Sequence, residues 1–198
     1  LPNWRTMFSI LMGHSSRQWP DTSAFANEDK TTFWYPRSAL ILADIWRSRR
    51  SLTKNGPYAI WIPDYFCNQS LMPLRELGAN IVFYPITKEL EPDWIVCREL
   101  AGQSPPGLFV LAHYFGKLSD GVEARSFTDQ FGAWLIEDAA HVLEPIVETD
   151  IVGDLIFYST HKTLAVPSGA FLQIQNTDLA FERQNYSLGS APLAWLIK

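Results

Sequence analysis

The chain has 198 residues, of which 47% are hydrophobic and 19% charged, with a formal net charge of −5 at pH 7. This composition is typical of one globular domain and excludes a disordered or low-complexity chain. The negative charge argues against a nucleic-acid partner or an anionic membrane surface, and no apolar run approaches the roughly 20 residues that span a bilayer. Cys67 and Cys97 form no CxxC pair. We therefore expect free thiols and a cytoplasmic location, although one disulfide stays open.

Residues 1–30 show no clean periodicity and are interpreted as an N-terminal arm, followed by one domain over residues 31–198. Helices are predicted where apolar residues recur at helical spacing, and buried strands where short apolar runs end at turn residues. In chain order the predicted elements are a helix over Ser38–Arg50, a strand over Tyr58–Ile62, a helical segment over Asn68–Leu77, strands over Ile81–Tyr84 and Leu108–Ala112, a helix within Ser119–Phe131, and strands over Trp134–Ile136, Leu155–Tyr158 and Ala170–Ile174.

Strands that are apolar throughout and alternate with helices indicate an α/β fold, with a mostly parallel sheet and helices on both faces. Such folds bind their ligands at the carboxyl ends of the strands. The residues that follow each predicted strand are therefore the candidates for a functional site.

A carboxylate follows the fourth predicted strand, in the sequence Glu-Asp-Ala-Ala-His over residues 137–141. We expect Asp138 at the ligand-binding edge, where the two small residues after it would let a flat ring lie close. A carboxylate in that place can pair with a protonated ring nitrogen and keep it positively charged. The plainer alternative is that Asp138 caps a following helix.

A lysine follows the strand over Leu155–Tyr158, in the sequence Ser-Thr-His-Lys over residues 159–162. Lys162, with hydroxyl groups close before it, suits an amine that forms a Schiff base beside a phosphate site. Such an amine must lose its proton before it attacks an aldehyde, and burial beside positive charge lowers its pKa. Taken alone, a lysine in this place is more often an ordinary surface residue.

Three further segments could complete such a site. The helix that begins at Ser38 offers free N–H groups and a hydroxyl to a phosphate, with the guanidinium of Arg37 just before it; Ser38 as a plain helix cap is the alternative. After the first predicted strand, Tyr65 and Phe66 could stack on a flat ring, although such aromatics are usually core. His113 follows the third predicted strand, where a lone histidine is more often structural.

Together these segments resemble the fold-type-I enzymes that use pyridoxal 5′-phosphate (PLP), and specifically the DegT/DnrJ/StrS-type aminotransferases, from about Phe33 to Ile174. Residues 137–141 are similar to the family's EDAAQ/H stretch, and residues 159–162 to its SxHK block. The other segments that resemble family motifs are residues 35–40 at the phosphate turn, residues 63–67 (PDYFC), residues 113–116 (HYFG) and Gly153-Asp154.

The resemblance implies a PLP-binding large domain in which Lys162 is the Schiff-base lysine and Asp138 binds the pyridine nitrogen. It also implies that His141 lies near the ring and its phenolic oxygen, and that Ser159 contacts the phosphate. By this resemblance Lys162, Asp138 and His141 are the candidate catalytic residues.

The chain also departs from the family pattern. Its phosphate turn lacks the family's Gly and Thr, so Arg37 and Ser38 both remain candidate phosphate ligands. The family's stacking aromatic corresponds to Cys67, which leaves Phe66 or Tyr65 for that role. We further expect that the C-terminal small domain of the family is absent or truncated.

The resemblance therefore implies a PLP-dependent aminotransferase that acts on a keto sugar attached to a nucleotide, with an amino acid as amino donor. The family resemblance implies a homodimer, in which each site is completed by the partner subunit. No metal site is expected. The alternative is a catalytically incomplete protein with the PLP-enzyme fold, truncated or degenerate, that has a binding or assembly role.

Overall fold

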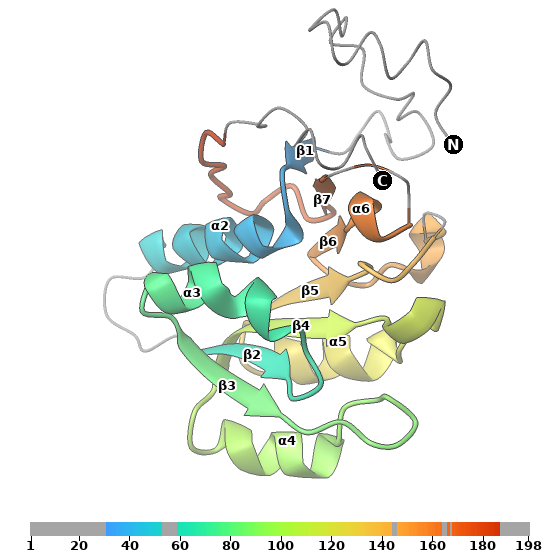
Figure 1. Cartoon of the computed structure of the whole chain (residues 1–198). Helices are drawn as coiled ribbons and strands as arrows, with labels where there is room; N and C mark the ends of the chain where they lie inside the picture. Colours follow the sequence, from blue (N-terminus) through green and yellow to red (C-terminus); the bar gives the residue numbers. More distant parts are fainter. Residues whose placement is uncertain (1–30, 53–58, 144–145, 164–165, 167, 187–198) are drawn as a thin grey trace, which may run out of the picture.

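The computed structural model describes residues 31–52, 59–143, 146–163, 166 and 168–186, so the predicted arm over residues 1–30 lies outside the described residues. At the centre is a seven-stranded sheet in the order β1-β7-β6-β5-β4-β2-β3 (Figure 1). The strands are β1 (Thr31–Tyr35), β2 (Ala59–Pro63), β3 (Asn80–Tyr84), β4 (Pro106–Ala112), β5 (Trp134–Asp138), β6 (Leu155–Tyr158) and β7 (Ala170–Ile174).

The sheet brings the ends of strands that are distant in sequence to one edge. Strands β3, β2, β4, β5 and β6 pair in parallel with their neighbours. Strand β7 pairs antiparallel with both β6 and β1. Strand β1 consequently ends at the same edge as the parallel strands, and β7 begins there.

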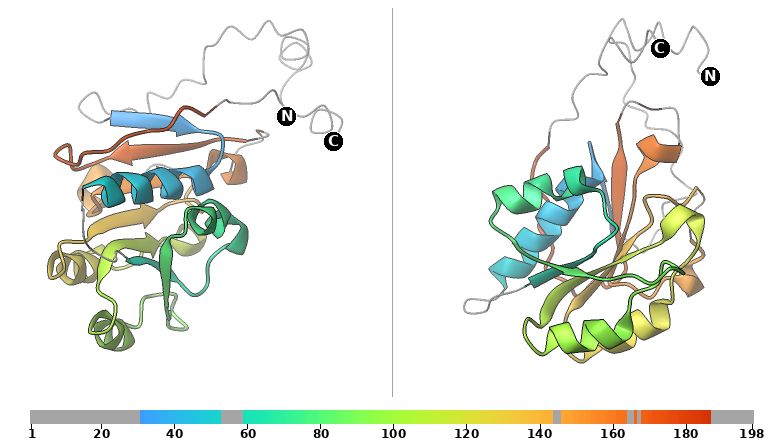
Figure 2. Two further views of the ribbon diagram at one scale, coloured as in Figure 1. Left: turned by 90° about the vertical axis from the view of Figure 1, so that its left-hand side faces the viewer. Right: turned by 60° about the horizontal axis from the view of Figure 1, so that its bottom comes forward.

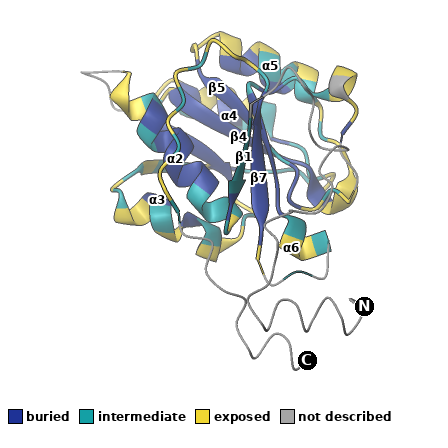
Figure 3. Ribbon diagram, turned by 90° about the horizontal axis from the view of Figure 1, so that it is seen from above, coloured by how far each residue is buried: buried dark blue, intermediate teal, exposed yellow. Residues whose placement is uncertain are grey.

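Helices cover both faces of the sheet, with α2 (Ser38–Ser51) and α3 (Met72–Glu76) on one face and α4 (Trp94–Ala101) and α5 (Gly121–Asp129) on the other (Figure 2). The side chains of β2 alternate accordingly, because successive residues of a strand point to opposite faces. Ile60 and Ile62 pack in the α2–α3 layer, and Trp61 packs in the α4–α5 layer. The central strands β2 and β4 are therefore buried on both sides (Figure 3).

The predicted fold class is confirmed, and the predicted strands are all present within a residue or two of their ends. The predicted helix within Ser119–Phe131 is α5, which Asp120 caps by accepting the N–H groups of Val122 and Glu123. The segment predicted as helical over Asn68–Leu77 is a 3₁₀ turn, η1 (Asn68–Leu71), that leads into α3, with Pro73 in the first turn of α3.

Elements that the sequence did not predict also appear. They are strand β1, helix α4, the single-turn helix α6 (Thr160–Thr163), and the short 3₁₀ turns η2 (Tyr114–Gly116) and η3 (Glu148–Asp150). Cys67 is exposed, Cys97 is buried and both are free, as predicted. Within the described ranges, no helix is long and apolar enough to cross a membrane.

Candidate active site

Two adjoining cavities lie at the carboxyl edge of the sheet. The narrower has a volume of about 50 Å³ and the wider a volume of about 310 Å³. Both are lined by Ser38, Cys67, Ser70 and Lys162. The narrow cavity is further lined by residues that follow β2, β4 and β5, and the wide one by residues at the start of α2 and around α6. The sites predicted from separate strands therefore meet at one place.

Asp138 is the last residue of β5 and lines the narrow cavity. Its Oδ1 accepts the N–H of Ala140 at 2.8 Å, and no helix begins within residues 139–143, so Asp138 is not a helix cap. Burial raises the pKa of the Asp138 carboxyl, against the opposing effects of the Ala140 N–H and the charges of Lys162 and His141. The contacts of the ionised carboxylate therefore do not fully offset the free-energy cost of its burial. A cationic partner in the cavity would offset the rest.

Lys162 lies on α6 and reaches the same cavity from the end of β6. Its Nζ is 3.3 Å from Nε2 of His141. The Lys162 side chain is exposed and not buried as the sequence reasoning supposed. The His141 ring stacks on Phe115, with ring centroids 5.6 Å apart and planes inclined by 15°.

The other end of the site is rich in hydroxyl groups. The Oγ atoms of Ser38 and Ser159 are 3.5 Å apart, and Ser159 is only 2% exposed. Arg37 lines the wide cavity beside Ser38, whereas Ser159 lies behind Ser38 and lines a separate cavity of about 70 Å³. Nδ1 of His161 lies 3.2 Å from the carbonyl oxygen of Gly169, so this nitrogen carries the proton.

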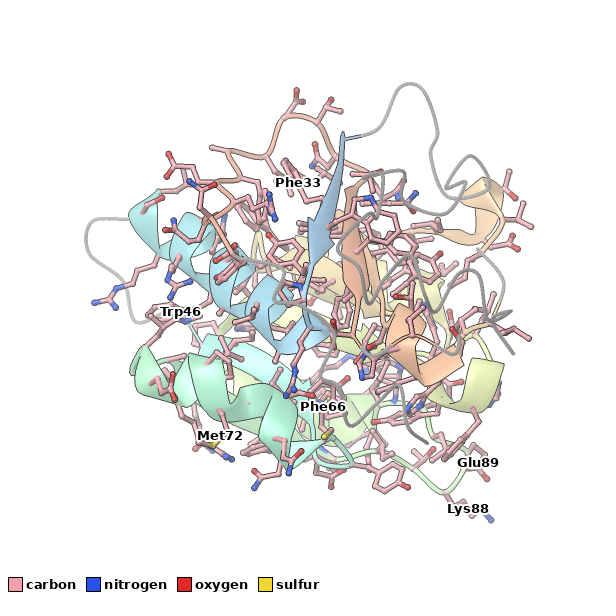
Figure 4. All side chains as sticks on the ribbon, turned by 45° about the horizontal axis from the view of Figure 1, so that its top comes forward. Phe33, Trp46, Phe66, Met72, Lys88 and Glu89 are labelled. Carbon is pink, nitrogen blue, oxygen red and sulfur yellow. The ribbon has the colours of Figure 1, made fainter. Side chains whose placement is uncertain are left out.

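The predicted aromatic side chains flank the narrow cavity. Phe66 and Tyr65 both line it. Phe66 also packs against the α2–α3 core, and Figure 4 places it between α3 and α6. Tyr65 is 57% exposed and packs against Tyr114 with ring centroids 5.6 Å apart. Both aromatics that the sequence left as alternatives are therefore within reach of a ring bound there.

A buried acid–imidazole pair supports the cavity floor. Nε2 of His113 is 2.8 Å from Oε2 of Glu137, and these side chains are 3% and 1% exposed. Glu137 Oε1 also accepts the N–H groups of Val152 and Gly153. The His113 main-chain N–H donates to the Asp138 carbonyl at 3.0 Å, which ties the end of β4 to the end of β5.

Several residues that line the cavities were assigned no role from the sequence. Those with hydrogen-bonding or thiol side chains include Cys67, Gln69, Ser70, Tyr114, His161 and Ser168. The hydroxyl groups of Ser70, in η1, and of Ser168, in the loop before β7, suit an anion, and their positions depend on the tertiary fold. The only available signal was their position just after β2 and just before β7.

These residues fit PLP by their chemistry. A desolvated carboxylate, Asp138, lies at one end, where the pyridinium N–H would satisfy it. Hydroxyl groups and the Arg37 guanidinium lie at the other end, where a phosphate would be held. Small residues, Ala112 and Ala140, line the narrow cavity between them and leave room for a flat ring. Lys162 is the amine that faces this space.

Solved structures with similar folds were found over nearly the whole chain. The aminotransferase PseC of Helicobacter pylori, involved in pseudoaminic acid biosynthesis, superposes with a TM-score of 0.68 at 14% identity over 91% of this chain and 52% of its own. A DegT DnrJ EryC1 StrS aminotransferase from Brucella abortus superposes with a TM-score of 0.66 at 14% identity, over 89% and 52% of the two chains. The chain has the large-domain fold of the fold-type-I PLP-dependent enzymes.

Among curated proteins, the serine hydroxymethyltransferase of Lactobacillus acidophilus is 32% identical over 111 residues, which is 52% of this chain and 25% of that protein. It also has the type I fold. The chain thus spans about half the length of the similar solved structures and about a quarter of the curated relatives. No family model matches the sequence. The resemblance to the DegT/DnrJ/StrS-type aminotransferases is confirmed as a likeness of fold.

Proposed function

We propose that this chain binds PLP through Lys162 and acts as an aminotransferase, with a nucleotide-linked keto sugar as amino acceptor and an amino acid as donor. The observation that carries the proposal is the meeting of Asp138 and Lys162 at one narrow cavity, next to a hydroxyl-rich pocket that Arg37 lines. The sugar substrate is supported by the fold shared with PseC, an aminotransferase in pseudoaminic acid biosynthesis.

Each residue would contact the part of PLP that its position in the cavities allows. Asp138 would hold the ring nitrogen in its protonated form, while Ser38 and Arg37 would anchor the phosphate. Ser159, to which the resemblance also assigns a phosphate contact, lies behind Ser38 and would support the Ser38 hydroxyl. Phe66, with Tyr65 as the alternative, would pack on the ring face. When bound, PLP supplies an electron sink for the bonds at the substrate carbon. Lys162 would hold the cofactor and then move the proton at that carbon as general base and acid.

The proposal includes a homodimer in the cytoplasm. The dimer is supported by large apolar side chains that stay exposed, such as Phe115 at 69%, which stacks on His141, and Leu143 at 65%, because a second subunit would cover them. The cytoplasmic location is supported by the two free cysteines. Light scattering after gel filtration measures the dimer directly.

The first experiment is to incubate the purified protein with PLP and record its visible absorbance, with and without borohydride, followed by peptide mass spectrometry. We expect a yellow species that borohydride fixes on Lys162 and that the variant Lys162→Ala lacks. A folded protein that stays colourless and unmodified would reject the cofactor assignment and favour the non-catalytic alternative.

A second reaction class is supported by the match to serine hydroxymethyltransferase, whose name implies an amino-acid substrate and carbon–carbon chemistry. Both reactions would begin at Lys162, so the choice of amino acid separates them. With glutamate, transamination predicts loss of the visible band and release of a keto acid. Preferential turnover of serine without a keto acid would favour the second class.

A further inference from the structure

The contact between Lys162 and His141 has a defined direction. Nζ of Lys162 lies 3.3 Å from Nε2 of His141. A lysine ammonium has three donors and no acceptor, so in this contact Nζ donates and the imidazole nitrogen accepts. The His141 ring is therefore neutral, with its own proton on Nδ1.

Two features hold the His141 ring in this state and place. Partial burial and the adjacent charge of Lys162 both lower the pKa of His141, and the carboxylate of Asp138 opposes them. The ring also stacks on Phe115, whose backbone has φ 55°, in the left-handed region. A bulky residue in that region is strained, and the surrounding structure must offset that strain.

We propose that His141 is the proton acceptor for Lys162, taking a proton from Nζ when the amine attacks a carbonyl carbon. This proposal rests on the proposed function, because the carbonyl is that of the cofactor. It gives His141 a role in addition to the contact with the phenolic oxygen that the family resemblance implies.

Lys162 Nζ starts with three protons and one positive charge. One proton passes to His141 Nε2, which frees the lone pair of the nitrogen to form the bond to carbon. His141 then returns that proton to the leaving oxygen, and a second proton from Nζ completes the water molecule as the carbon–oxygen bond breaks. The third proton stays on nitrogen, so the charge is conserved.

Other titratable groups face the same cavity, and none is placed as well for this transfer. The Asp138 carboxylate accepts the Ala140 N–H, and the proposed function gives it to the ring nitrogen. His113 Nδ1 accepts the Ser119 N–H and its Nε2 faces Glu137. The remaining groups that face the cavity are Tyr65, Cys67 and Tyr114.

The first test measures the His141 imidazole by NMR titration of the cofactor-free protein, with His141→Gln used to assign its signal. In the wild-type protein we expect a midpoint below the ordinary histidine value of about 6.5. Lys162→Met removes the adjacent charge and should raise the midpoint. Lys162→Arg retains the charge and should hold it near the wild-type value. Equal midpoints in all three proteins would show that Lys162 and His141 are not in contact in solution, and would overturn the proposal.

The second test measures how fast the protein captures PLP, by stopped-flow absorbance. Gln at position 141 can accept a hydrogen bond but cannot take up the proton, so His141→Gln should slow capture about 100-fold, the lower end of general-base effects, while the final occupancy is retained. Free imidazole should accelerate capture by His141→Ala. Capture by both variants at the wild-type rate would overturn the role proposed for His141 and leave the proposed function standing. A wild-type protein that captures no PLP would remove the proposed function as well.

Discussion

His113 donates a hydrogen bond from Nε2 to Glu137 Oε2 at 2.8 Å, in a region that solvent does not reach. The direction follows from the other ring nitrogen, because Nδ1 accepts the main-chain N–H of Ser119 at 3.2 Å. The Glu137 carboxylate therefore receives three hydrogen bonds, from His113 and from the N–H groups of Val152 and Gly153. It joins the ends of β4 and β5 to the loop that precedes β6.

We expect Glu137→Gln to lower the free energy of unfolding by about 1–3 kcal/mol, because it leaves a buried donor without an acceptor. The amide oxygen can still accept the two main-chain N–H groups. The amide NH₂ then faces His113 Nε2, and shifting the ring proton to Nδ1 only moves the conflict to the Ser119 N–H. Urea unfolding measures the loss.

The matched control is Glu123→Gln, which makes the same change in the exposed pair with Arg98. Exposed ion pairs contribute less than about 1 kcal/mol, so this variant should stay close to the wild type. Equal losses in the two variants would contradict the assigned role of Glu137.

Gly153→Ala should destabilise the protein, by about 1–3 kcal/mol as for other overpacked sites. A Cβ at this position would lie 3.0 Å from Glu137 Cγ, from Glu137 Oε1 and from the Leu155 carbonyl oxygen. Gly102→Ala is the contrasting variant, because Gly102 has helical backbone angles and its nearest contact is 3.4 Å away. That substitution should stabilise by about 0.4–1 kcal/mol. Melting temperatures that move in the same direction would contradict this account.

Asp138→Asn should stabilise the cofactor-free protein at neutral pH. Burial raises the pKa of the Asp138 carboxyl in the folded state, so the folded protein binds more protons than the unfolded chain between the two pKa values. Stability therefore falls as the pH rises through this window, and the cost persists above it. Asn removes the charge and can still accept the Ala140 N–H through its side-chain oxygen.

The gain should vanish below the unfolded-state pKa, where the carboxyl is protonated in both states. With PLP present the wild type should be more stable than Asp138→Asn, because only the wild type has a carboxylate for the ring nitrogen. Thermal unfolding at several pH values, with and without PLP, checks both statements. A stability difference that does not vary with pH would contradict the first.

Iodoacetamide should modify Cys67 and spare Cys97 in the folded protein. Hydrogen bonding by Ser70 lowers the pKa of the exposed Cys67 thiol, and Lys162 adds to this effect. Burial raises the pKa of Cys97 to about 12. The thiolate is the reactive form, so alkylation of Cys67 should rise with pH around a midpoint below the ordinary thiol value.

Two further results are expected from the same mass-spectrometric assay. Ser70→Ala should shift the Cys67 profile to higher pH, because the lowering hydrogen bond is lost. PLP should protect Cys67, since this residue and Lys162 line the same two cavities. Labelling of Cys97 before unfolding would show that its layer of the core opens more readily than its burial implies.

The buried strands could be predicted because runs such as residues 108–112 are apolar at every position, which only a two-sided layer satisfies. Strand β1 was missed because its sequence, TTFWY, begins with polar residues and lies next to a segment without periodicity. Helix α4 did carry a signal, since Asp93 caps it by accepting the Val96 N–H. A single turn such as α6 is too short to show helical spacing.

The site was predictable to the extent that it follows from sheet direction. Asp138 and Lys162 follow neighbouring parallel strands, so their approach could be expected before the structure was known. The partnership of Glu137 with His113, and the place of Ser70 in the wall, depend on loop paths and side-chain directions that local sequence does not encode. Local sequence does not encode the exposure of Lys162 either, because that exposure depends on how α6 packs.

Strand β1 pairs with β7, so that Thr31 lies opposite Ile174, and this pairing brings Pro36 to Gly169, whose N–H it accepts. The two walls of the wide cavity, at Arg37 and Ser168, thus come from opposite ends of the described chain. Contacts between such distant segments are slow to form, because loop closure must precede them. We therefore expect the cavity to be completed late in folding, so that a ligand held between these walls would bind the finished sheet and not a partly folded chain.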